Sequence, residues 1–394
     1  MHIKKYNSNI NLILILLFIP IIGIYHITSA GSTQFDYFTR LADSFLKGIY
    51  WLTEQPSWLT ELIPVTQTKY YVVYPPMPAI LSVIPRFFFG INFEQQYLAH
   101  LLGYGFSVVM ALLAYKLTKS FKKSIWIGLL TSVGTIVWFL SSVGSSWYLG
   151  QISAVFFMSL AIYFGINSKN NFLVGLFIGA AFLSRIETIL CSVFFLYLYW
   201  DNKKWFINYF KFGIGVIPFL LFNFIYNYLR FGTIFDQAYF LLPAILNETN
   251  MPWFIHGVAS PIYILDNIKV MFWSFPKTIK EFPYIIPSWA GLSIWITTPA
   301  FIYSLFADMK DKSVRYSWIS ILLIMLLVFT HGGTGWAQFG YRFAVDFYPF
   351  LIFIIIKTLE KSNLKWHHWL LLFISIFVNL WGVLWINKFG WVTF

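Results

Sequence analysis

Apolar stretches long enough to cross a lipid bilayer recur along this chain and limit what it can fold into. A transmembrane helix needs about 20 consecutive apolar residues. Residues 10–27, 96–117, 206–228 and 366–385 form runs of about that length, and 59% of all residues are hydrophobic. The sequence therefore predicts an all-α fold and a polytopic membrane protein.

The distribution of charge favours a membrane protein over a nucleic-acid-binding one. Lysine and arginine outnumber aspartate and glutamate by 27 to 15, for a net charge of +12. In a soluble protein this excess would suggest nucleic acid as a partner, but here it lies in short loops between apolar runs, as the positive-inside rule predicts. We therefore expect the lipid bilayer, and no nucleic acid, as a partner. The single cysteine, Cys191, excludes a cysteine-based metal cluster.

The same rule orients the chain in the membrane. With basic stretches such as 116–123 and 357–365 in the cytoplasm, the chain makes about eleven crossings and has two long outer loops, residues 31–95 and 230–287. The whole chain, 1–394, is then one integral membrane domain. Carboxylates concentrate in the outer loops, so we expect any active site on the extracytoplasmic side of a bacterial or archaeal cell membrane.

Two of the apolar stretches allow more than one interpretation. Residues 172–200 are interrupted at Arg185, and a single crossing there would put Lys203 outside, so we predict two short crossings that meet at Arg185. Residues 10–27 also fit a signal peptide, because residues 28–30 resemble a cleavage site. The length of the apolar run favours a retained first span.

The first outer loop concentrates charge in a chain that is only 11% charged. Between residues 35 and 48 the apolar side chains recur at helical spacing, which predicts an amphipathic helix at the membrane surface. The opposite face of this helix carries four charged residues, Asp36, Arg40, Asp43 and Lys47. The prolines of residues 74–78 then predict an extended return to the bilayer without a helix.

Short motifs recur in a familiar order along the chain. They are Phe35-Asp36-Tyr37, Ala42-Asp43-Ser44, Tyr74-Pro75-Pro76, Leu183-Ser184-Arg185, Leu229-Arg230-Phe231 and Gly340-Tyr341-Arg342. This pattern resembles the GT-C superfamily of polytopic glycosyltransferases, mannosyltransferases among them, which use polyprenyl-phosphate-linked sugars. The resemblance implies an inverting transfer of a hexose from a polyprenyl-phosphate donor on the extracytoplasmic side. An envelope glycan, glycolipid or protein would be the acceptor, and Asp36 matches the aspartate at the catalytic centre.

The chemistry of such a transfer requires a base for the acceptor hydroxyl and cations for the departing phosphate. Asp36 is our candidate base, and the alternative is an ion pair with Arg40 one helical turn away. Asp43 lies on the same face two turns along. It is a second catalytic candidate that assists the base or binds a divalent metal ion, and the alternative is a solvated helix face. We assign no metal ligands from the sequence and expect no other cofactor.

Two arginines are candidates for the phosphate, because guanidinium forms bidentate hydrogen bonds with phosphate oxygens. They are Arg342 and Arg185, and the alternatives are ion pairs with Asp346 and Glu187 respectively. His331 is a third candidate for phosphate contact, and Glu187 is a candidate for substrate contact.

Three tyrosines of the first outer loop are further candidates for substrate contact. Tyr70, Tyr71 and Tyr74 are expected to stack on the sugar or the prenyl chain. The alternative is an aromatic belt at the membrane interface.

Two other functions compete with sugar transfer. A transporter or lipid flippase would also place ionisable residues within its spans, but here the charges cluster in the outer loops and no inverted repeat is visible. An envelope-polymer ligase with a diphosphate-linked donor would need more outer arginines. Motifs for nucleotide binding and for serine or zinc hydrolases are absent from the sequence.

Overall fold

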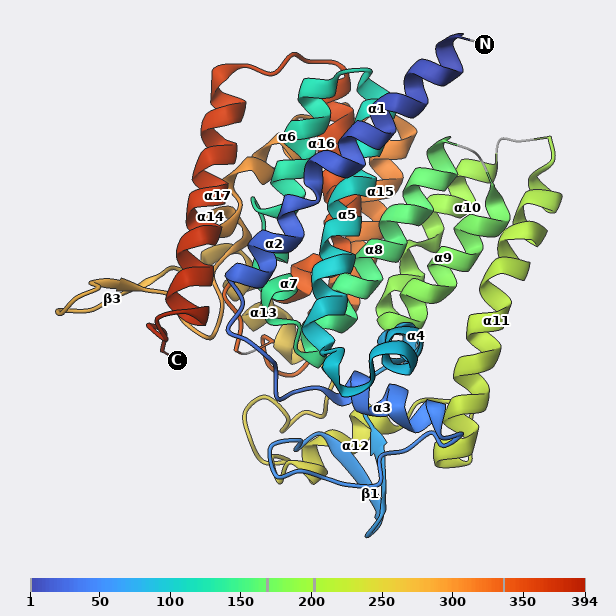
Figure 1. The fold of residues 1–394 in the computed structure, drawn as a ribbon, viewed down its shortest axis with the longest axis vertical. Coiled ribbons are helices and arrows are strands. Elements are labelled where there is room, and N and C mark those ends of the chain that lie inside the picture. Colours follow the sequence, from blue (N-terminus) through green and yellow to red (C-terminus); the bar gives the residue numbers. More distant parts are fainter. Residues whose placement is uncertain (1, 168–169, 201–202, 336, 394) are drawn as a thin grey trace.

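The computed structural model shows a bundle of helices with a smaller lobe of loops, short helices and strands at one end (Figure 1). It describes residues 2–167, 170–200, 203–335 and 337–393. The N-terminus lies at the end of the bundle away from this lobe, and the C-terminus lies nearer the lobe.

Long apolar helices form much of the bundle. Within the described residues, five helical stretches are long and apolar enough to span a membrane, or six if one bent pair is counted as a single span. The first is 9–27, formed by α1 (His2–Phe18) and α2 (Pro20–Ile27). The others are α5 (Gln95–Thr118), α8 (Ser146–Asn167), α11 (Trp205–Phe231) and α17 (Trp366–Asn387). The chain is thus a multi-pass membrane protein, and the predicted number of eleven crossings stays a prediction.

Two further apolar stretches are each broken into shorter helices in the structure. The stretch 125–140 is divided between α6 (Phe121–Ser132) and α7 (Val137–Val143), which meet at an angle of 54°. The stretch 289–306 forms only the short α14 (Ile294–Thr297) and the 3-10 helix η4 (Pro299–Phe306). Pro299 has no backbone N–H to continue the hydrogen bonding of α14, so the chain begins a new helix there.

The helical path breaks at Arg185, where we predicted that two short crossings meet. Arg185 has an extended backbone, with φ −151° and ψ 111°, and ends α9 (Asn171–Ser184). The 3-10 helix η2 (Ile186–Cys191) and α10 (Ser192–Trp200) follow it. Both α9 and α10 extend toward the end of the bundle where the N-terminus lies (Figure 1). The side chain of Arg185 is therefore presented at a reversal of the chain.

The first outer loop contains the predicted amphipathic helix as α3 (Tyr37–Leu46). It also contains an antiparallel hairpin of β1 (Leu62–Thr66) and β2 (Lys69–Val72), so the all-α prediction was incomplete. The expectation that the prolines after Tyr74 prevent a helix was wrong. Helix α4 (Met77–Phe89) begins directly after Pro76, because proline is well suited to the first turn of a helix, where its missing N–H has no partner to lose.

The second outer loop folds over the same end of the bundle. It contains α12 (Ala238–Ile245), η3 (Pro261–Tyr263), α13 (Ile264–Trp273) and a hairpin of β3 (Lys277–Thr278) and β4 (Ile285–Ile286). Backbone hydrogen bonds join this loop to the segment that follows α15 (Lys312–Val328). Ser260 N donates to Thr330 O at 2.7 Å, and Gly332 N donates to Val258 O at 2.7 Å. The two segments are therefore fixed relative to each other.

The core of the bundle surrounds α16 (Tyr348–Glu360). Side chains of this helix from Tyr348 to Ile356 are at most 4% exposed where they are apolar, and α5, α8, α15 and η4 pack around it. The preceding 3-10 helix η5 (Arg342–Phe347) is wholly buried as well. Because α16 is enclosed by protein, it contributes a fixed centre against which the outer loops are positioned.

Close contact between α9 and α11 depends on glycine. A Cβ atom on Gly215 of α11 would lie 2.3 Å from the carbonyl oxygen of Phe172, whereas a Cβ on Gly213 would meet nothing within 4 Å. Small residues at such contacts let helix backbones approach closely in a membrane. We predict that Gly215→Ala lowers the free energy of unfolding by about 1–3 kcal/mol through overpacking.

The matched control is Gly213→Ala on the same helix. It should be neutral or stabilising by up to about 1 kcal/mol, because alanine favours helix over glycine. Thermal unfolding midpoints of the two purified variants in detergent would check this. Equal effects of the two substitutions would show that the α9–α11 contact adapts without cost.

Candidate active site

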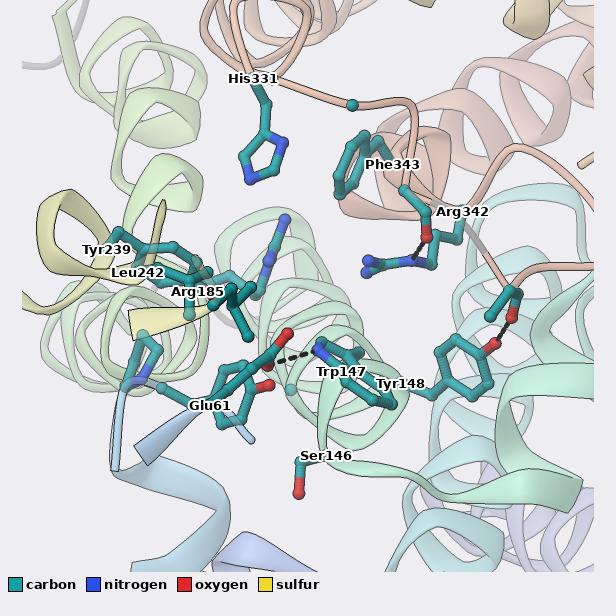
Figure 2. Close-up of a pocket in the computed structure, with 18 of the residues that line it drawn as sticks. Glu61, Ser146, Trp147, Tyr148, Arg185, Tyr239, Leu242, His331, Arg342 and Phe343 are labelled. Carbon is teal, nitrogen blue, oxygen red and sulfur yellow. Dashed lines mark hydrogen bonds between the residues drawn. The ribbon is translucent and has the colours of Figure 1, made fainter. Parts of the chain in front are cut away.

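A cavity of about 400 Å³ lies where the two outer loops meet the ends of the buried helices. In the first loop its walls come from α3, the residues directly before β1 and those that follow β2. The other walls come from α12 of the second loop, the start of α8, the break after α9 and the segment between α15 and η5. Figure 2 shows Glu61 on one side of this cavity and His331 on the opposite side, with Arg185 between them. The cavity therefore brings together acidic and basic side chains from distant parts of the sequence.

Arg342 lines the cavity with a guanidinium group that the protein holds in place. Its Nε donates to the carbonyl oxygen of Gly335 at 2.7 Å, and its Nη1 lies 3.4 Å from Oε1 of Gln151. The residue is 9% exposed. The alternative role that we considered for Arg342 was an ion pair with Asp346. In the structure Asp346 instead pairs with Arg185 at 2.8 Å. Arg342 is thus available to an anion in the cavity.

Arg185 is shared between two carboxylates and the same cavity. Its Nη2 contacts both Asp346 and Glu187, while its Nε is buried without a partner among the described residues. The guanidinium carbons of Arg185 and Arg342 lie 5.9 Å and 4.8 Å from the ring centre of Phe343. Because both arginines lie over one ring, a single phosphate group could contact both.

His331 adds a neutral imidazole to this basic wall. Burial lowers its pKa to about 4, and the nearby positive charges of Arg342 and Arg185 act in the same direction. The buried Nδ1 has no hydrogen-bond partner among the residues that the structure describes. At neutral pH His331 therefore offers hydrogen bonding to a ligand and no charge.

Glu61 is the carboxylate that faces the arginines across the cavity. Its Oε2 accepts a hydrogen bond from Trp147 Nε1 at 2.9 Å (Figure 2). Burial raises the pKa of the Glu61 carboxyl to about 7, with the charge of Glu248 acting in the same direction, while the Trp147 bond and the charge of Arg342 oppose the shift. A pKa near neutrality is the value at which a carboxylate is most useful as a general base at physiological pH.

Glu61 was not among our sequence-based candidates. It is one of several carboxylates in the outer loops, and no motif distinguishes it. Its place depends on long-range contacts, since its backbone N–H donates to the Tyr37 hydroxyl at 3.1 Å and its side chain meets α8. The nearest signal in the sequence is its position directly before the β-branched and apolar residues of β1.

The two aspartates that we predicted as catalytic do not line this cavity. Asp36 pairs with Arg40, with 2.7 Å between Oδ1 and Nε, which is the alternative that the helical spacing offered. Asp36 lies directly before Tyr37, whose hydroxyl contacts Glu61. The catalytic role of Asp36 stays a prediction, and Phe38, two residues further along the chain, lines the cavity.

Asp43 has both carboxylate oxygens engaged by Arg86 of α4. Arg86 Nε lies 2.7 Å from Oδ1, and Nη2 contacts Oδ2. Arg86 Nη1 also donates to the carbonyl oxygen of Phe93 at 3.1 Å. Asp43 therefore joins α3 to α4. In the described part of the chain no three His, Cys, Asp or Glu side chains are grouped to hold a metal ion, so the metal role of Asp43 stays a prediction.

The three predicted tyrosines separate in the structure. Tyr74 lines the cavity, and its buried hydroxyl has no hydrogen-bond partner among the described residues. Tyr71 is buried in a small apolar cluster of the outer lobe, under the ammonium group of Lys69. Tyr70 donates its hydroxyl to the Gln67 carbonyl at the hairpin turn. Only Tyr74 is placed where it can contact a ligand in this cavity.

A second cavity of about 200 Å³ adjoins the first and shares Arg185, His331 and three other residues with it. Its remaining wall is mainly apolar and includes Val258, Leu327 and Val328. Glu187, our predicted substrate contact, lines this second cavity beside Arg185. The two cavities together could bind a ligand that has an anionic group near Arg185 and an apolar chain.

Comparison with known proteins identifies the fold. No family model matches the chain, and no curated protein matches it. The crystal structure of ArnT from Cupriavidus metallidurans bound to undecaprenyl phosphate superposes with a TM-score of 0.55 and 12% identity, covering 92% of this chain and 62% of that chain. The apo structure of ArnT gives a TM-score of 0.50 and 12% identity over 91% of this chain and 62% of that one.

The chain thus has a polytopic fold of the GT-C type, as the sequence motifs predicted. It shares this fold with ArnT, and the chain spans about three fifths of the length of the ArnT structures it matches. At 12% identity this likeness concerns the fold.

The Asp43–Arg86 pair allows the structural role of Asp43 to be tested against its predicted catalytic role. The side chain of Arg86 is only 9% exposed, so Asp43→Asn would leave a largely buried guanidinium with a weakened partner. We predict a loss of about 1–3 kcal/mol in the free energy of unfolding and little change in the activity of the folded protein. Thermal unfolding and an activity assay on the same sample would measure both.

Asp266→Asn is the matched control, because Asp266 pairs with Lys269 at the surface and is 65% exposed. It should change the free energy of unfolding by less than about 0.5 kcal/mol. An Asp43→Asn variant that unfolds normally but loses activity would instead support the catalytic role predicted from the sequence.

Proposed function

We propose that the protein is a glycosyltransferase that moves a hexose from a polyprenyl-phosphate donor to an acceptor hydroxyl. The acceptor would be an envelope glycan, glycolipid or protein, and the reaction would take place on the extracytoplasmic side of the membrane. One observation carries the proposal: a single cavity holds the buried Arg342 and the partly buried Arg185 opposite a partly buried carboxylate, that of Glu61, whose pKa is near 7. The GT-C fold supports the same reaction class.

In the proposed reaction the acceptor oxygen attacks the anomeric carbon and forms the new glycosidic bond. The bond between that carbon and the phosphate oxygen breaks, and the phosphate leaves with the electron pair. Arg342 and Arg185 stabilise the negative charge that develops on the phosphate. The carboxylate of Glu61 accepts the proton of the acceptor hydroxyl. Attack opposite to the leaving group inverts the anomeric configuration.

The prenyl chain of the donor has a matching surface next to the arginines. The second cavity begins at Arg185 and His331 and continues between Val258 and Val328. Burial of an apolar chain there is favourable by roughly 25 cal/mol per Å² of apolar surface. This arrangement supports a lipid-linked donor over a soluble sugar nucleotide.

The base assignment is tested by comparing two carboxylates. We predict that Glu61→Gln lowers the transfer rate by about 100-fold to 10,000-fold, the usual effect of removing a general base. Asp36→Asn should lower it only slightly, because Asp36 lies outside the cavity wall and pairs with Arg40. Purified protein with a synthetic polyprenyl-phosphate hexose and envelope extract provides the assay.

Glu281→Gln is the control for this comparison, since Glu281 is exposed in the β3–β4 hairpin, away from the cavity. The reverse outcome, with Asp36→Asn inactive and Glu61→Gln active, would restore Asp36 as the base. A wild-type protein that moves lipid across vesicles without glycosyl transfer would point to the transporter or flippase alternative.

The pH dependence of the reaction offers an independent test. A base must be deprotonated to act, so the wild-type kcat/KM should rise with pH through about 7, where Glu61 loses its proton. The positive charge of Arg342 lowers the pKa of Glu61. Arg342→Gln should therefore move the midpoint of this rise to higher pH as well as reduce the rate.

Arg342→Lys keeps the charge and serves as the matched variant. We expect the midpoint to stay near that of the wild type while the rate falls about tenfold or more, because a lysine cannot form a bidentate contact with phosphate. A wild-type profile that is flat between pH 6 and 8 would contradict Glu61 as the titrating base.

A further inference from the structure

The cavity is divided into a basic side and an acidic side. Arg185 and Arg342 form the basic side, and Glu61 has a second carboxylate near it, that of Glu248 from the second outer loop. The charge of Glu248 is close enough to contribute to the raised pKa of Glu61. The reaction proposed above uses Glu61 and the arginines but leaves Glu248 without a role.

Glu248 is held in the cavity wall by its neighbours. Trp253 Nε1 donates to Glu248 Oε2 at 2.8 Å, and the backbone N–H of Glu248 donates to the Pro243 carbonyl at 2.8 Å. Oε1 of Glu248 has no hydrogen-bond partner within the described part of the chain. A fixed carboxylate with one unused acceptor oxygen therefore lines the cavity.

Close packing of the loops keeps this carboxylate at a constant distance from the basic side. A Cβ on Gly332 would lie 1.9 Å from the carbonyl oxygen of Trp253, so the two loops touch backbone to backbone at this point. The hydrogen bond from Gly332 to Val258 lies next to this contact. Gly332 directly follows His331, so the position of Trp253 is tied to the phosphate side of the cavity.

A second group in the same cavity also lacks a partner. Tyr74 is 4% exposed, and its hydroxyl oxygen is buried with no hydrogen bond to any described residue. The Tyr74 ring meets those of Trp147 and Tyr239 edge to face, at 6.4 Å and 6.5 Å between centres. An unpaired buried hydroxyl costs free energy unless a ligand or water satisfies it. The cavity thus offers a hydroxyl and a carboxylate oxygen to a ligand beside aromatic surfaces.

We propose that Glu248, Tyr74 and Trp253 form a subsite for a hydroxyl-rich sugar ring. Hydroxyl groups of the ring would donate to Glu248 Oε1 and exchange a hydrogen bond with the Tyr74 hydroxyl. Aromatic side chains would cover the apolar C–H face of the ring. Glu248 is then a specificity-determining residue, because a ligand without these hydroxyls leaves its carboxylate unpaired.

This subsite rests on the proposed function, and it extends that function by placing the sugar at the acidic side while the phosphate lies at the arginines. The ring it holds is either the hexose of the donor or a sugar of the acceptor, since the hydrogen-bonding chemistry is the same for both. The experiment therefore has a donor arm and an acceptor arm.

The donor arm measures binding of two probes to the purified full-length protein in detergent. One probe is a polyprenyl phosphate, and the other is the same lipid carrying a hexose. The wild type should bind the hexose-bearing lipid about tenfold or more tightly than the bare lipid. Glu248→Gln should remove most of this preference without weakening the bare lipid, and Tyr74→Phe should reduce it by a smaller factor. Glu281→Gln should retain it.

The acceptor arm measures the KM for acceptor in the transfer assay with saturating donor. A raised acceptor KM in Glu248→Gln, with the donor preference intact, would assign the subsite to an acceptor sugar. Unchanged donor preference and unchanged acceptor KM in a Glu248→Gln protein that still binds bare lipid would overturn the proposal. Retained bare-lipid binding shows that the variant is folded.

The two proposals fail in different ways. If the wild type transfers no sugar but its preference for the hexose-bearing lipid depends on Glu248, the proposed reaction is wrong and the subsite stands. If the wild type transfers sugar and neither Glu248→Gln nor Tyr74→Phe alters any binding or KM value, the reaction stands and the subsite is wrong.

Discussion

A buried ion pair between Arg185 and Asp346 joins the parts of the chain from which the candidate site is built. Asp346 is completely buried, and Gln151 of α8 approaches both of its carboxylate oxygens at 3.4 Å. Removing one partner of such a pair leaves an uncompensated charge in the apolar interior and costs about 3–5 kcal/mol. The break after α9, the helix η5 and the N-terminal part of α8 are therefore held in one arrangement, and the basic side of the cavity depends on it.

The other side of the cavity depends on contacts between the outer loops. Trp147 at the start of α8 orients Glu61 of the first loop, while Trp253 orients Glu248 of the second. The second loop is in turn bonded to the segment that carries His331. Acidic and basic groups thus face each other across a fixed gap, which suits a substrate with a phosphate at one end and hydroxyl groups at the other.

The sequence predicted several of the features that a lipid bilayer imposes on a chain. Apolar length indicated α5, α11 and α17 nearly residue for residue. The bidentate hydrogen bonding of guanidinium indicated Arg185 and Arg342, both of which line the cavity. These features are local. A membrane span depends only on its own apolar residues, and an arginine within an apolar run is energetically costly, so it usually has a function. The motifs also predicted the GT-C type of fold, which the structural comparison confirmed.

Tertiary structure alone determines which carboxylates line the cavity. Asp36 and Asp43 stand out in the sequence because they share the polar face of one helix, yet Arg40 and Arg86 engage them outside the cavity. Glu61 has no distinguishing neighbours in the sequence, and it becomes a candidate base only when Trp147 and burial act on it. Apolar spacing along a chain therefore determines where helices cross a membrane. The pKa of a carboxyl depends instead on which distant groups surround it, and only the folded chain brings those groups together.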